Sequence, residues 1–408
     1  MVEKEEEGLF SDLKVIDAAS FLAGPCAATI MADYGADVVK IEPPVGDRHR
    51  SIAAGHPSDW SWQLTNRSKR SLALDITTEA GYEVLMKMIA QADVFLVNFS
   101  AGQLEKYRLT WDTLKTVNPR LIFAQISAFG LEGQESDRRA FDLTGWFART
   151  GILDMIREKD VPPSVPAGGV GDHATAMTLY AGIISALYRR DRTGEGSMVS
   201  TSLAATGAWA NGLNLQAVIG GVDTAARRDK EGWSNPVQNV FTTKDDRYIF
   251  IAVQNLKRDF DKLIDVLDRP DWREMEDMQP VKPLFRNRFK ARERIAEAIR
   301  AFDAAEILER LDRAGIVHEL IRRNAEVLED EQLIANGLIV PFDSGRPGCD
   351  RTFATPFKLA DEPQRKPVAA PEVGQDSEEV LAEFGLSPEE VAALKADGVV
   401  GPRKRRKI

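Results

Sequence analysis

LKVIDAASFLAGPCAATIMADYGADVVKIE, residues 13–42, is the stretch that decides the fold. Its two ends, LKVIDAAS and ADVVKIE, are short and rich in apolar β-branched residues, a composition typical of buried strands. Between them, Pro25 is placed to open a helix, because a proline at the first helical position loses no hydrogen bond. Strand, helix and strand in this order form the repeating unit of a parallel sheet.

The same alternation continues along the chain. Strands are expected at SLALDI (71–76), DVFLVNF (93–99) and RLIFAQISAFG (120–130), and Thr77 can cap a helix after the first of them. The order predicts an α/β protein, in which helices cover both faces of a parallel sheet. Ligands of such sheets bind beyond the carboxyl ends of the strands, so residues 20–23, 98–100 and 128–130 lie at a candidate site. The turn SFLAGP lacks the GxGxxG fingerprint of dinucleotide-binding proteins, and no Walker loop is present.

The pattern changes after about residue 205, and this change predicts how the domains are arranged. VQNVFTTKDDRYIFIAV has two β-rich runs around a polar turn and predicts a hairpin, and Ser387 with Glu390 predicts a capping box. We expect a large domain over 10–205, a linker over 206–229, a smaller α+β domain over 230–335, a return to the large domain over 336–400, and a basic tail over 401–408.

Composition limits the classes of function. The 408 residues include 43% hydrophobic residues and can bury a large core, but no 18 apolar residues run together and the N-terminus is acidic. Neither secretion nor a membrane partner is expected, and a cytoplasmic location fits best. Cys26 and Cys349 stand outside any metal or disulfide spacing, so no metal site is expected.

The net charge of −10 argues against nucleic-acid partners. The tail GPRKRRKI has five basic residues in eight, however, and leaves a nuclear-localisation or nucleic-acid patch as an alternative to a solvated tail.

Asp172 lies in GGVGDHATAM, residues 168–177, between glycines and a long apolar run. The residues alone leave two interpretations. The carboxylate caps a helix by accepting backbone N–H bonds. Alternatively, the helix N-terminus and the flexible Gly169 and Gly171 hold an ionised carboxylate where a substrate can approach it, and Asp172 acts as a nucleophile.

Segments along nearly the whole chain resemble the class III CoA-transferase family, with its formyl-CoA transferase, carnitine CoA-transferase and α-methylacyl-CoA racemase branches. They occur in the family's order: LKVIDAASFLAGP, MADYGADVVKIEPPVGD, NRSKRSLALDI, ADVFLVNFSAGQLEKYRLTWDTLKTVNPRLIFAQISAFG, GDHATAMTLYAGIISALYRRDRTGEGSMVSTSL, NPVQNVFTTKDDRYI and EEVLAEFGLSPEEVAALKADGVV. The resemblance implies a Rossmann-like large domain, a smaller α+β domain and an interlocked homodimer. The implied substrates are coenzyme A thioesters and small carboxylic acids, with no tightly bound cofactor.

The resemblance also assigns roles to residues. The family's nucleophilic aspartate lies in a GD motif before this helix, so that role falls on Asp172, with a ping-pong exchange through an aspartyl anhydride and an aspartyl-CoA thioester. Asp142, aligned with a family glutamate, would help to stabilise intermediates together with Gly169 and Gly171; otherwise it is a polar residue in a helix first turn. The residues assigned to CoA binding are Leu22, Ala23, Leu74, Asp75, Ile76, Thr77, Asn98, Phe99, Ser100, Lys106 and Arg139.

The chain departs from the family at several positions. Leu22 replaces a glutamine of formyl-CoA transferase, so oxalate is not expected as the acceptor. The loop DKEGWSNP holds one glycine, Gly232, where that enzyme has a glycine-rich closing loop. The racemases pair their aspartate with a histidine, but here Phe141 stands in its place, and among the four histidines only His173 adjoins Asp172. A racemase or epimerase of the same fold and a non-catalytic CoA-binding protein stay as alternatives to CoA transfer.

Overall fold

The computed structural model of the chain describes residues 8–53, 55–158, 161–224 and 235–403. The chain divides into two compact units. The large unit contains Met1–Leu153, Val165–Gly212 and Glu331–Ile408, and the small unit contains Asp154–Ser164 and Leu213–Asp330. Both ends of the sequence therefore contribute to the large unit.

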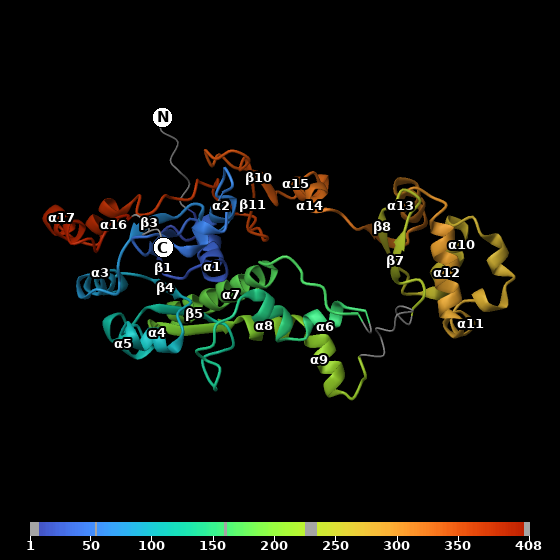
Figure 1. Ribbon diagram of the computed structural model, residues 1–408, viewed down its shortest axis with the longest axis horizontal. Coiled ribbons are helices and arrows are strands. Elements are labelled where there is room, and N and C mark those ends of the chain that lie inside the picture. Colours follow the sequence, from blue (N-terminus) through green and yellow to red (C-terminus); the bar gives the residue numbers. More distant parts are fainter. Residues whose placement is uncertain (1–7, 54, 159–160, 225–234, 404–408) are drawn as a thin grey trace. The chain divides into compact units, whose positions relative to one another are not determined.

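A six-stranded sheet in the order β3-β2-β1-β4-β5-β6 forms the centre of the large unit (Figure 1). All of its pairings are parallel. The predicted α/β class with a parallel sheet is thus confirmed, and the strand order reverses between β1 and β4, the place where such sheets open a crevice. The strands are β1 (Lys14–Asp17), β2 (Asp37–Glu42), β3 (Arg70–Ala73), β4 (Val94–Val97), β5 (Ile122–Ser127) and β6 (Ser197–Ser202).

Helices cover both faces of this sheet. On one face α1 (Ala23–Asp33) packs against α7 (Val170–Thr193), and the core there includes Val15. On the other face α3 (Glu79–Ile89) contributes to a second core that includes Ile16. These neighbouring residues of β1 enter opposite cores because side chains of a strand alternate between its faces. The other helical segments before β6 are η1 (Arg48–Ser51), α2 (Trp60–Asn66), α4 (Ala101–Lys106), α5 (Trp111–Val117), η2 (Leu143–Ala148) and α6 (Ile152–Ile156).

Two predicted helix starts differ in detail. α1 begins at Ala23, so Pro25 is its third residue, still within the first turn, where its missing N–H costs no hydrogen bond. Thr78, and not Thr77, caps α3, because the Thr78 hydroxyl accepts from the Gly81 N–H at 3.1 Å.

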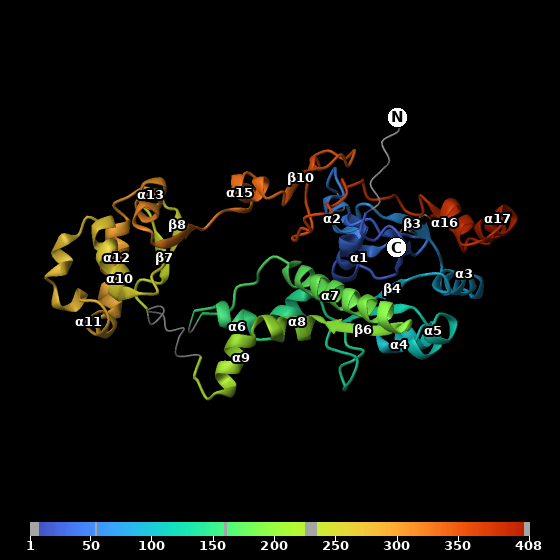
Figure 2. The ribbon, with the colours of Figure 1, turned by 180° about the vertical axis from the view of Figure 1, so that it is seen from behind.

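The C-terminal segment completes the large unit. In both ribbon views α16 (Ser377–Glu383) lies beside β3, and the Asp376 carboxylate accepts from the Ser71 N–H at 2.7 Å (Figures 1 and 2). The predicted capping box of Ser387 and Glu390 is confirmed at the start of its last helix. The remaining elements of this segment are α15 (Glu331–Ala335), the antiparallel strands β10 (Ile339–Pro341) and β11 (Arg351–Phe353), and α17 (Pro388–Ala396).

The small unit has an antiparallel three-stranded sheet, β7-β8-β9, and its own core. β7 (Asn239–Thr242) and β8 (Tyr248–Ala252) form the predicted hairpin. Its other elements are α10 (Leu256–Val266), η4 (Pro270–Arg273), η5 (Glu276–Met278), α11 (Lys282–Arg286), α12 (Arg288–Ile299), α13 (Ala304–Ala314), β9 (Val317–Leu320) and α14 (Asn324–Val327).

The residues expected to form a linker, 206–229, are mostly helical within their described part, 206–224. They hold the end of α8 (Leu203–Ala210) and all of α9 (Gly212–Ile219). The sequence of α8 has no apolar stripe that would predict a helix, since hydrophobic and small residues surround it on every side. Among the described residues, no helix combines the length and hydropathy needed to cross a bilayer.

Candidate active site

Asp172 lies in the first turn of α7, as its third residue. The helix is preceded by Gly169, whose φ of +104° is a left-handed conformation that favours glycine. Gly169 is the N-cap residue, and no side chain caps this helix. Asp172 is therefore inside the helix, and the interpretation of Asp172 as its N-cap is wrong.

Asp142 connects the start of η2 to the start of α7. Its side chain is buried, and one carboxylate oxygen accepts from the Leu143 N–H at 2.7 Å while the other accepts from the Gly169 N–H at 2.6 Å. Asp142 is thus the N-cap of η2 as well as a neighbour of the GD motif. The two hydrogen bonds fix its negative charge close to Asp172.

Burial, and to a smaller extent the nearby charge of Asp142, raise the pKa of Asp172 to about 7. The positive end of α7 acts against this shift because it favours an anion. A carboxyl group with such a pKa is about half ionised near neutral pH. A perturbed carboxyl group at a helix terminus is a candidate for catalysis.

The turn between β1 and α1 faces the same place. A Cβ at Gly169 would lie 4.0 Å from the Leu22 Cδ1 atom. The preceding residue, Phe21, has a left-handed φ of +64°, and its ring meets that of Phe141 edge to face at 5.6 Å. Phe141 is 63% exposed. Apolar and aromatic side chains therefore stand beside the two carboxylates.

The loops after β1 and β4 are joined by Asn98. Its side-chain oxygen accepts from the Ser20 N–H at 3.0 Å, and its side-chain nitrogen donates to the Ser20 carbonyl at 2.9 Å. Ser100 begins α4 as part of a capping box with Gln103. The structure thus places the residues that follow β1 and β4, which were assigned to CoA binding, at the crevice where the strand order reverses.

Other predicted site residues follow β3 or are exposed on other segments. Leu74 is buried and forms a β-bridge with Val400, and Asp75 accepts a hydrogen bond from the Thr77 hydroxyl. This segment follows β3, which β2 separates from β1. Lys106 and Arg139 are exposed cations.

Two features of this region were not predicted from the sequence. Phe21 lies within the predicted range 20–23, but a phenylalanine does not predict a left-handed backbone. Trp146 packs so closely on Gly171 that a Cβ there would lie 2.5 Å from the Trp146 Cγ atom. Gly171 is therefore required for packing on Trp146. Gly232, the one glycine of the loop DKEGWSNP, lies outside the described residues.

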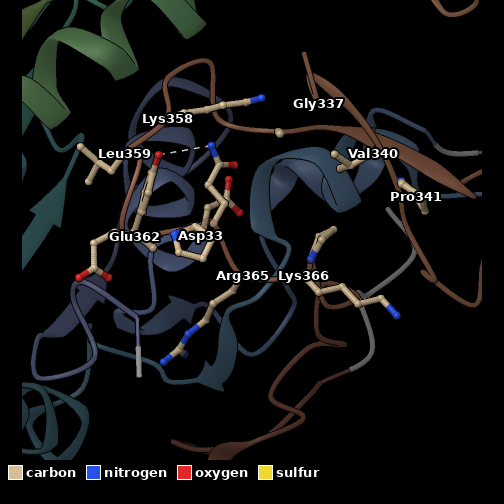
Figure 3. A pocket seen from close by; sticks show the side chains of 14 residues that line it. Asp33, Gly337, Val340, Pro341, Lys358, Leu359, Glu362, Arg365 and Lys366 are labelled. Atoms are coloured by element: carbon tan, nitrogen blue, oxygen red, sulfur yellow. Dashed lines mark hydrogen bonds between the residues drawn. The ribbon is translucent and has the colours of Figure 1, made fainter. Parts of the chain in front are cut away.

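A separate pocket of about 580 Å³ lies at the opposite end of α1 (Figure 3). Asp33 and Tyr34 line it together with residues 337–367, among them Lys358, Glu362 and Arg365. None of the predicted site residues lines this pocket. Since α1 is about 15 Å long, the pocket and Asp172 are distinct places in the fold.

The chain is similar to known proteins along most of its length. Residues 10–377 match the sequence profile of CoA-transferase family III. The chain is 30% identical to the (R)-2-hydroxy-4-methylpentanoate CoA-transferase of Clostridioides difficile, over 96% of this chain and 99% of that protein. It is 31% identical to the cinnamoyl-CoA:phenyllactate CoA-transferase of Clostridium sporogenes, over 98% of each. A CaiB/BaiF family protein of Brucella suis has a similar structure, with a TM-score of 0.81 and 27% identity over 93% of this chain and 100% of that one.

The parallel sheet and the matching relatives define an enzyme that transfers CoA. The chain belongs to CoA-transferase family III, as the resemblance predicted. Membership of this family makes the protein a CoA-transferase.

Proposed function

We propose that the protein moves CoA from an acyl-CoA donor to a carboxylic acid through covalent intermediates on Asp172. The observation that carries the proposal is the half-buried carboxylate in the first turn of α7, next to the buried Asp142. Its raised pKa supports the role, because a more basic carboxylate is a better nucleophile and is still ionised in part at neutral pH.

The exchange proceeds in four attacks. An Asp172 oxygen attacks the thioester carbonyl, the C–S bond breaks, and a mixed anhydride and CoA thiolate result. The thiolate attacks the aspartyl carbonyl, and the donor acid leaves as a carboxylate from the aspartyl-CoA thioester. An acceptor carboxylate then attacks this thioester and forms a second anhydride while the thiolate leaves. The thiolate finally attacks the acceptor's acyl carbonyl, which gives the new acyl-CoA and restores the Asp172 carboxylate, with no net gain or loss of protons.

Each attack forms an oxyanion that needs hydrogen-bond donors. The first backbone N–H groups of α7, from Val170 to Asp172, have no partner inside the helix and are suited to this task. The Gly169 N–H already donates to Asp142, so an oxyanion would compete with that carboxylate for it. We therefore assign the oxyanion to the N–H groups of the first turn, and assign to Asp142 the positioning of Gly169.

CoA is proposed to lie along the carboxyl ends of the strands, from the segment Leu74–Thr77 after β3 to the segment Asn98–Ser100 after β4. These ends span three strand spacings, about 14 Å, which suits an extended ligand. The exposed Lys106 and Arg139 would supply charge for its phosphates. Lys106→Ala and Arg139→Ala are each expected to raise KM for acyl-CoA and to weaken its salt dependence, while an unchanged KM in both would exclude these cations from the CoA site.

The acceptor is proposed to be a carboxylic acid with an apolar side chain. Phe21, Leu22 and Phe141 beside the carboxylates offer apolar contacts and no cation for a second carboxylate. The names of both relatives describe acids of this kind, with a branched or a phenyl side chain. Assays with phenyllactate, 2-hydroxy-4-methylpentanoate and oxalate should give the highest kcat/KM for one of the first two. Preference for oxalate would refute this assignment.

A homodimer and a cytoplasmic location complete the proposal. Trp209, Leu213 and Ile219 are 88%, 85% and 76% exposed in the single chain, and apolar surface of this kind is commonly covered by a partner. Sedimentation is expected to give a dimer, and a folded, active monomer would exclude it.

The nucleophile is tested by trapping. The protein is incubated with acyl-CoA and then with hydroxylamine, and peptide mapping is expected to find the modification on Asp172. Asp93→Asn serves as a control, because Asp93 pairs with Arg190 at 2.8 Å at the end of α7 opposite Asp172 and should leave trapping unchanged. Modification of another residue, or CoA binding with no transfer to any acid, would contradict the proposal; the latter would favour a non-catalytic CoA-binding protein.

A further inference from the structure

Three charged side chains inside the large unit have no part in the proposed chemistry. Asp17 ends β1, Lys40 lies in β2 and Lys69 directly precedes β3, and their side chains are fully buried. Asp17 lies between the two ammonium groups, 2.9 Å from Lys69 and 3.8 Å from Lys40. Replacing buried charges with apolar residues of similar volume often leaves a protein equally stable. Stability alone therefore does not explain why these three charged side chains are buried here.

All three side chains bind the turn between β1 and α1 or the first turn of α1. The Lys40 ammonium donates to the Ala19 carbonyl, and the Asp17 carboxylate accepts from the Ala19 N–H at 3.1 Å. The Lys69 ammonium donates to the Pro25 carbonyl at 2.7 Å. The backbone is thus fixed on both sides of residues 20–24, and this set of contacts is here called the charge clamp.

Between the fixed points the chain adopts an unfavourable conformation. Phe21 has φ of +64°, a region that side chains with a Cβ rarely adopt and that persists only where the surroundings impose it. The hydrogen bonds of Asn98 with Ser20 hold the same turn from β4. The strained residue and its successor, Leu22, form the side of the turn next to Phe141 and Gly169. The charge clamp thus fixes the position of Phe21 and Leu22 relative to Asp172.

We propose that Asp17, Lys40 and Lys69 are positioning residues for the transfer, which hold the β1–α1 turn so that acyl groups meet Asp172 in a reactive orientation. The inference rests on the proposed function of Asp172. The clamp touches no reacting atom, and its effect passes through the backbone of residues 19–25. Displacement of a positioning element by about 1 Å can cost about 100-fold in rate, so a small shift of this turn is enough to matter.

Lys40→Met and Lys69→Met test the clamp, since methionine fills much of the volume without the charge. Burial lowers the pKa of Lys69 to about 8. Assays near pH 7 are below this value and therefore leave the side chain largely ionised. In the full-length protein, each variant is expected to lower kcat/KM for the acid about 10- to 100-fold, with hydrogen exchange increased in residues 18–24. The matched control is Arg190→Met, which removes a buried cation, 6% exposed in its side chain, that pairs with Asp93 far from the turn. It should lower Tm but keep kcat and KM within about twofold.

The outcomes separate the two proposals. If Asp172 is trapped in the wild-type protein and both lysine variants keep kcat/KM while only Tm falls, the clamp is structural and the inference is overturned. If Asp172 is not trapped in the wild-type protein, the proposed function itself fails. Should either methionine variant not fold, Lys40→Leu, which likewise cannot donate to the Ala19 carbonyl, is used, and the same kinetic loss and exchange increase are required of it.

Discussion

Replacing Asp172 with asparagine should abolish transfer and at the same time stabilise the protein at alkaline pH. The pKa of Asp172 is about 7 in the folded protein against an ordinary value of 3.8. The folded state therefore holds its proton more tightly than the unfolded state does. The stability that this proton provides is present at low pH and is lost as the pH rises towards 7.

The shift gives the magnitude. A rise of about three pKa units corresponds to about 4 kcal/mol, at 1.36 kcal/mol for each unit. Asparagine has nearly the shape of the protonated carboxyl group but never ionises. The variant should consequently gain about 3 to 4 kcal/mol over the wild type between pH 4 and pH 8.

Urea unfolding at these two pH values measures the difference, and transfer assays on the same samples measure the loss of activity. Asp93→Asn is the control, because it breaks the ion pair with Arg190 and should give no gain in stability at pH 8. An equal stability difference at both pH values would refute the electrostatic reasoning. Near-native turnover by Asp172→Asn would refute the nucleophile.

Three further outcomes follow from the same contacts. The kcat/KM for acyl-CoA should rise as the pH passes through about 7, and in Asp142→Asn the midpoint should move to lower pH because a neighbouring negative charge is removed; a profile that does not shift would show that Asp142 has no electrostatic effect on Asp172. Gly171→Ala should cost about 1–3 kcal/mol, measured by thermal unfolding, because the added Cβ would collide with Trp146, and a variant of wild-type stability would mean that this contact relaxes freely. Thr78→Ala should cost about 1 kcal/mol in urea unfolding through loss of the α3 cap, and no loss would point to another cap.

The sequence predicted the sheet well because most of its strands are apolar runs between helices. β6 escaped detection because SMVSTS contains only two apolar side chains. Thr77 and Thr78 are adjacent and equally able to cap, so only the path of the backbone decides between them. Local sequence rules thus predict that a helix or strand is present, but not the residue at which it begins or ends.

The candidate active site was predictable only in part. The position of Asp172 followed from the resemblance of its motif, whereas its neighbourhood depends on tertiary contacts. Asp142 binds Gly169 across 27 positions of sequence, and no local pattern predicts that bond. The left-handed Phe21 is likewise imposed by distant side chains, and its own residue type disfavours the conformation.

The late return of the C-terminal segment determines when the large unit can be finished during synthesis. Val380 and Leu381 are fully buried in the same core as Leu72 and Leu85, about 300 positions earlier in the chain. Until these last residues leave the ribosome, apolar surface of β3 and α3 stays uncovered and open to misassociation. Such distant contacts also make folding slow. A nascent chain stopped before residue 377 should therefore bind chaperones that the finished protein does not need.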